Sequence, residues 1–74
     1  MSKLYSSNEI AFVLNLLEYN FISQKGSHGK FKNLKGIIKI LPMSKMEIPE
    51  GTLSGILKQV KITNKEFLEY LKKK

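Results

Sequence analysis

The first part of the chain shows the hydrophobic spacing of an amphipathic helix. Apolar residues recur at intervals of three and four positions, which places them on one helix face: Ile10, Val13, Leu14 and Leu17. Ser6 and Glu9 are spaced for a capping box, in which each side chain bonds the backbone N–H of the other residue. The pattern therefore predicts a helix over residues 6–19, with Asn20 as its left-handed C-terminal residue.

After this helix the residue pattern changes to short segments rich in β-branched and aromatic residues, which are separated by glycine and polar residues. This pattern predicts three antiparallel strands joined by two hairpins. The predicted strands are "FISQK" at 21–25, "HGKFKN" at 28–33 and "GIIKIL" at 36–41.

Side-chain alternation gives the second of these strands two different faces. One face receives Gly29 and Phe31, so Phe31 is the expected core contact. The other face receives the polar members of the segment, His28, Lys30 and Lys32. The third strand is apolar at every position but Lys39, which favours a strand covered on both faces. Pro42 is expected to end it because proline cannot donate to a sheet.

A connector with two prolines over residues 42–51 precedes a second helical pattern. Apolar spacing marks its first helix, at Leu53, Ile56, Leu57 and Val60. Its start is assigned either to Pro49 in the first turn or to Thr52 as the cap. Thr63 and Glu66 fit a second capping box, so the last helical part is split in two.

The resulting order is α-β-β-β-α, which predicts an α+β fold over a single domain of residues 1–74. The simplest architecture is a three-stranded antiparallel sheet with the helices packed on one face. The opposite sheet face, which carries His28, Lys30 and Lys32, is then free for solvent or a ligand.

Composition removes several kinds of chemistry. The chain has 74 residues, no cysteine and one histidine, which excludes disulfides, thiolate metal sites and cysteine nucleophiles and argues strongly against structural zinc. We therefore expect no metal and no cofactor. No apolar stretch approaches the roughly 20 residues that span a bilayer, and the start lacks a signal-peptide pattern. The expectation is a soluble cytoplasmic protein without a membrane partner.

The charge points to a polyanionic partner. The net charge is +7, and all thirteen basic residues are lysine. Lysine acts as a point charge on phosphate, whereas arginine is the usual bidentate reader of guanine. Binding to a phosphate backbone is therefore better supported than reading of a base sequence. The alternative is that the lysine content reflects only the composition of the genome.

Three stretches in the predicted order carry a family resemblance: "QKGSHGKF" at 24–31, "IPEGTLSGILKQVKI" at 48–62 and "EFLEYL" at 66–71. Together they resemble the HicA family of mRNA interferase toxins. The resemblance implies a fold similar to double-stranded-RNA-binding domains and a toxin that cleaves RNA and halts translation. It also implies a HicB-like antitoxin that covers the active site.

The family's catalytic histidine falls on His28 by motif match. Two positions depart from the family pattern. Ser23 stands where many members carry an arginine, and the segment "PMSKME" at 42–47, which includes Ser44, lacks the second histidine that many members have.

The chemistry of RNA suits a site of this kind. RNA carries its own nucleophile, the 2′-hydroxyl, so a cleaving enzyme needs a proton donor or acceptor and positive charge near the phosphate. Histidine suits the first task and lysine the second. We assign His28 as the general acid or base and, as ligands of RNA phosphate, Lys25, Gly26, Ser27, Lys30 and Lys32.

Each of these residues also has an ordinary structural interpretation. A lone histidine in a turn is usually a solvated side chain, the glycine and serine are typical turn residues, and the lysines can simply keep a strand face soluble. Two other functions stay open: a non-catalytic RNA-binding module, and a basic domain that binds an acidic protein. Only the nuclease interpretation explains why the sole histidine lies in a Gly-Ser-His turn.

Overall fold

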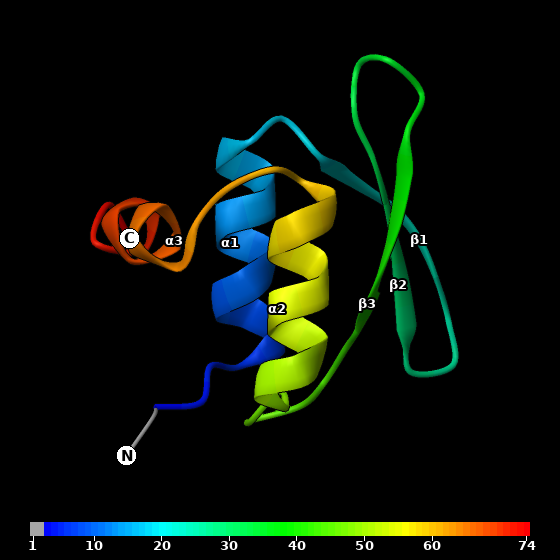
Figure 1. The fold of residues 1–74 in the computed structure, drawn as a ribbon. Helices are drawn as coiled ribbons and strands as arrows, with labels where there is room; N and C mark the ends of the chain where they lie inside the picture. The colour runs from blue at the N-terminus through cyan, green and yellow to red at the C-terminus, as the bar shows by residue number, and fades with distance from the viewer. Residues whose placement is uncertain (1–2) are drawn as a thin grey trace.

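The computed structural model describes residues 3–74 and has the predicted α+β order. Figure 1 shows the sheet on one side of α1 and α2, with α3 beyond α1 and away from the sheet. This arrangement is consistent with a fold like that of double-stranded-RNA-binding domains. The elements are α1 (Ser7–Leu16), β1 (Asn20–Lys25), β2 (His28–Lys32), β3 (Ile38–Pro42), α2 (Glu50–Gln59) and α3 (Asn64–Leu71).

The start of α1 is the predicted capping box. The Ser6 hydroxyl accepts from the Glu9 backbone N–H at 3.2 Å, and the Glu9 carboxylate accepts from the Ser6 N–H at 2.9 Å. The predicted end was wrong, because the left-handed residue is Glu18, with φ of 66°, and Asn20 begins β1. The helix closes as a Schellman motif, in which the Tyr19 N–H donates to the Leu14 carbonyl at 2.9 Å. Burial of Tyr19 in the core fixes this earlier end.

Glu9 makes part of the stability dependent on pH. The backbone hydrogen bond from Ser6 holds the pKa of the Glu9 carboxyl below its ordinary value. A lowered pKa in the folded state stabilises the protein above the unfolded pKa, and this contribution is lost as the pH falls through the folded value. We expect Glu9→Gln to lower the free energy of unfolding at pH 7 by about 0.3–1 kcal/mol. Urea denaturation at pH 7 and pH 3 should show this difference only at pH 7.

The start of α2 decides between Pro49 and Thr52, the two residues that the sequence left open for this position. Pro49 is the cap residue of α2 and makes no side-chain cap bond, so Thr52 lies inside the helix. At α3 the predicted capping box is confirmed, with the Thr63 hydroxyl accepting from the Glu66 N–H at 3.1 Å.

The strands pair in sequence order, so β2 is the central strand and β1 and β3 are its neighbours. Both pairings are antiparallel, as predicted, and the β1–β2 register shifts by one residue between Phe21 and Ser23, at a bulge. Phe31 of β2 points to the helices, where its ring meets the ring of Phe21 edge to face at 5.6 Å. The prediction that Phe31 is the core contact of this strand is confirmed.

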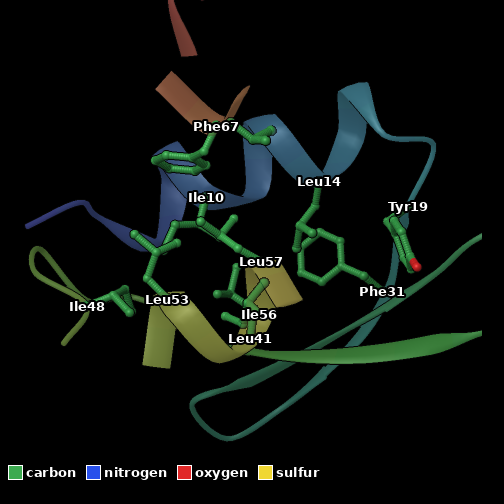
Figure 2. Packing of buried hydrophobic residues seen from close by; sticks show 11 residues of the cluster. Ile10, Leu14, Tyr19, Phe31, Leu41, Ile48, Leu53, Ile56, Leu57 and Phe67 are labelled. Atoms are coloured by element: carbon green, nitrogen blue, oxygen red, sulfur yellow. The ribbon is translucent and has the colours of Figure 1, made fainter. Parts of the chain in front are cut away.

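The core lies between the helix-facing side of the sheet and the three helices (Figure 2). At its far end the ring of Phe67, from α3, is fully buried and meets the ring of Tyr5 edge to face at 5.1 Å. The other buried apolar side chains come from α1, α2, β2, β3 and the connecting segments: Ile10, Val13, Leu14, Tyr19, Phe31, Leu41, Ile48, Leu53, Ile56 and Leu57. The helices thus cover one sheet face and leave the other open.

The expectation that β3 is covered on both faces was wrong. Ile38 and Ile40 are 46% and 48% exposed, whereas Leu41 is fully buried. The reason is that helices pack on one side of the sheet only, so alternate residues of β3 face solvent. Lys39 is the register partner of Phe31 and lies on the helix side at the sheet edge. The run of apolar residues therefore marks an exposed apolar surface and not a strand covered on both faces.

Candidate functional site

The site forms around the two-residue turn that joins β1 to β2. Gly26 has φ of +59° and occupies the first turn position, where a type II′ hairpin requires glycine. The Gln24 side-chain amide donates to the Gly26 carbonyl at 2.9 Å, and the Met43 backbone N–H donates to the Ser27 carbonyl at 2.6 Å. The turn is thus held both by its own strand and by the residue that follows β3.

Register places the candidate side chains on the open face of the sheet. Lys25 lies opposite His28, and Ser23 lies opposite Lys30. Side chains at such directly paired positions have Cβ atoms about 4.5–5.5 Å apart. The His28 imidazole is exposed between cationic neighbours on its own strand and on β1.

These residues line a shallow open depression of about 650 Å³, which we call the hairpin hollow. It brings together five of the six predicted site residues, and its lining is Ser23, Lys25, Gly26, Ser27, His28, Lys30 and Ile40. Lys32 shares the face of His28 but lies farther along β2, outside the hairpin hollow. The geometry suits a phosphate held beside an imidazole, with further phosphate contacts along β2.

Two lining residues were not among the predicted site residues. Ser23 was noted only as the position where relatives carry arginine, and its pairing with Lys30 puts that position inside the hairpin hollow. Ile40 was assigned to a covered strand, although it is the register partner of Lys30. Strand alternation was the signal that could have placed Ile40 on the open face, because neighbouring residues of a strand point to opposite faces and Leu41 faces the core.

Gly29 has a packing role on the opposite face of the same strand. A Cβ built on Gly29 would lie 2.7 Å from the Met43 Cγ and 3.4 Å from the Phe21 ring. The missing side chain therefore lets Met43 cross close to β2 immediately after β3. Met43 is also the residue whose N–H bonds the hairpin turn, so this close approach helps to position the turn.

Ser7 fixes the end of β3 from the helix side. Its side chain is 1% exposed; its hydroxyl donates to the Pro42 carbonyl at 2.6 Å and accepts from the Lys45 N–H at 3.0 Å. Pro42 is the register partner of His28, so α1 is tied to the strand end that flanks the histidine. A serine in the first turn of a helix gives no signal of such a long-range contact, and sequence reasoning missed it.

We expect Ser7→Ala to lower the free energy of unfolding by about 2 kcal/mol, because two partly buried backbone groups lose their hydrogen-bond partner. Urea denaturation would measure the change. Ser54→Ala is the matched control, since Ser54 is exposed on α2 and should change stability by no more than about 0.5 kcal/mol. Equal effects of the two substitutions would contradict a role for the Ser7 bonds.

The described residues, 3–74, contain no group of three side chains from His, Cys, Asp and Glu that could hold a metal ion. Across the same residues, no helix has the length and apolar character needed to cross a membrane.

Comparison with models of known protein families identifies the family of this chain. The model of the family described as the HicA toxin of bacterial toxin–antitoxin systems matches residues 7–62, well over half of the chain. The chain belongs to the HicA toxin family. A search of curated proteins finds no match. Membership makes the protein a toxin of a toxin–antitoxin pair and implies an antitoxin partner of the HicB type. The match contains the whole hairpin hollow, whereas α3 and its Phe67 lie beyond it.

Proposed function

We propose that this HicA-family protein is an endoribonuclease that cleaves mRNA at the hairpin hollow. The observation that supports this most directly is that the sole histidine lines an open hollow together with Lys25 and Lys30. An exposed imidazole beside two ammonium groups provides a proton carrier and positive charge at one place. That combination is what RNA transesterification requires.

In the proposed reaction the 2′-hydroxyl of one nucleotide attacks its own 3′-phosphate. The new bond joins the 2′-oxygen to phosphorus, and the bond from phosphorus to the 5′-oxygen of the next nucleotide breaks. One proton leaves the 2′-hydroxyl and one is added to the departing oxygen. The products are therefore a 2′,3′-cyclic phosphate and a free 5′-hydroxyl.

The residues of the hairpin hollow take separate roles in this proposal. His28 transfers one of the two protons as general acid or base. Lys25 and Lys30 stabilise the negative charge that grows on the phosphate, and Lys32 binds the adjacent phosphate along β2. Gly26 and Ser27 form the turn, and they contact the phosphate from the tip of the hairpin. A HicB-like antitoxin would silence the toxin by covering this face in the cytoplasm, where mRNA is available.

The purified toxin should cut an unstructured RNA in buffer containing EDTA and leave 2′,3′-cyclic phosphate ends. Product ends can be identified by mass spectrometry of a short oligonucleotide. Binding without cleavage under these conditions would favour the non-catalytic RNA-binding module. No affinity for RNA, together with tight binding of the antitoxin, would favour a protein-interaction domain.

A further inference from the structure

The open face of the sheet carries two parallel rows of different chemistry. The cationic row lies on β2 and consists of Lys30 and Lys32, with His28 on the same face at the turn end of the strand. The isoleucine row lies on β3 and consists of Ile38 and Ile40, each nearly half exposed. Register pairs Lys30 with Ile40 and Lys32 with Ile38, so each lysine has an isoleucine directly beside it. The cationic row alone would suit any polyanion. The isoleucine row adds the requirement that the ligand also has apolar surface beside its negative charges.

From this pairing we infer that the isoleucine row is a platform for unpaired RNA bases, so the site takes single-stranded and not duplex RNA. The inference rests on the proposed RNA-directed function and names the substrate form of the same site. Two neighbouring nucleotides would place their phosphates on the cationic row and their bases on Ile40 and Ile38.

The spacing of the two rows fits a single strand. Side chains on one face of a strand repeat every two residues, about 6.6 Å apart, which is close to the separation of successive phosphates on an extended RNA strand. Neighbouring strands lie about 4.8 Å apart, and a base projects sideways from its phosphate by a comparable distance. A nucleotide therefore spans one lysine–isoleucine pair.

Duplex RNA cannot use both rows at once. In an A-form helix the bases are stacked and paired inside, and protein contacts are made mostly with phosphates and 2′-hydroxyls. Only a strand with unstacked bases can lay them against an apolar surface. Because isoleucine offers no hydrogen-bonding group in its side chain, the platform should tolerate all four bases.

Exposure of the two isoleucine side chains to water is unfavourable, so a bound partner that covers them gains free energy. Ile40 lines the hairpin hollow with His28 and Lys30, so its apolar surface adjoins the position proposed for the scissile phosphate. Charge complementarity selects the occupant, since an apolar surface flanked by a row of lysines suits a polymer with anionic links and flat bases. The open face is thus matched to RNA on both rows.

The test measures binding separately from cleavage by using 2′-O-methyl RNA, which lacks the free 2′-hydroxyl and cannot be cut by the proposed reaction. A fluorescent single-stranded 12-mer and its duplex are titrated with wild type and with the double variant Ile38→Thr/Ile40→Thr. Threonine keeps the strand preference of the residue but removes apolar surface. The matched control is Leu34→Thr, because Leu34 is 82% exposed and lies between β2 and β3, outside both rows.

We expect the double variant to bind the single strand about five- to tenfold more weakly, with duplex binding and the salt dependence unchanged. Leu34→Thr should bind like wild type. By contrast, Lys30→Gln should weaken both forms and reduce the single-strand salt slope by about 0.7. This contrast separates an apolar platform from general damage to the face.

Equal single-strand affinity of the double variant and wild type would overturn the inference, as would an equal loss for duplex. If the double variant loses affinity only for the antitoxin, the row is a protein contact and the inference is also wrong. Cleavage of unmodified RNA by wild type is scored independently. If wild type cleaves RNA and the isoleucine substitutions have no effect on binding, the nuclease proposal holds and the platform is wrong. If the substitutions weaken single-strand binding but wild type does not cleave RNA, the platform holds and the nuclease proposal is wrong.

Discussion

Replacing His28 with alanine is expected to lower the rate of RNA cleavage by roughly 100- to 10,000-fold, the usual contribution of a positioned acid or base. His28 is the only imidazole in the chain and lies in the hairpin hollow beside Lys25 and Lys30. The remaining lysines would still hold the phosphate, so affinity for RNA should persist. Single-turnover cleavage of a labelled RNA, with growth arrest on induction as a second readout, would measure the loss.

Controls separate this loss from misfolding. His28 is exposed, so His28→Ala should keep the urea midpoint of the wild type and its affinity for 2′-O-methyl RNA. Gln24→Ala is a useful comparison in the same hairpin, because it removes the bond to the Gly26 carbonyl but no proton carrier. If His28→Ala cleaves RNA as fast as wild type, the catalytic assignment of this residue is wrong.

Phe67→Ala is expected to have the largest effect on stability, a loss of about 3–5 kcal/mol in the free energy of unfolding. The ring is fully buried and packs edge to face on Tyr5, so its removal leaves a cavity between α3, α1 and the N-terminal segment. A domain of this size has a total stability of only about 4–11 kcal/mol. Urea denaturation followed by circular dichroism should show a largely or partly unfolded variant at 37 °C.

The neighbouring Leu68 provides the matched control for this change. Leu68 is 39% exposed on the same helix, so Leu68→Ala should cost well under half as much as Phe67→Ala. Phe67→Leu should recover much of the loss because it refills most of the cavity. Comparable losses of stability for the two alanine variants would mean that the stabilisation by α3 does not depend specifically on the Phe67 ring.

The local signals in the sequence predicted most of the fold. Both capping boxes form because they need only residues three positions apart, and the alternation of β2 is confirmed because one buried Phe31 decides its face. The same alternation brought His28 and Lys30 to the open face. The pairing of His28 with Lys25 followed from a two-residue turn that glycine makes possible.

Long-range geometry could not be predicted in this way. The end of α1 depends on where Tyr19 enters the core, and the exposure of Ile38 and Ile40 depends on which face the helices cover. The hydroxyl of Ser7 bonds a carbonyl 35 positions away, and no local pattern marks such a contact. These features arise from packing between elements, which hydrophobic periodicity alone does not specify.

The isoleucine row also affects how the free protein behaves in solution. Two copies could cover their exposed isoleucines by associating, and a net charge of +7 opposes this at low ionic strength. Salt shortens the range of that repulsion from about 10 Å at 0.1 M to about 3 Å at 1 M. High salt, the usual means of stripping nucleic acid from a basic protein, should therefore also promote its self-association. Colloidal stability is then best where affinity for RNA is highest.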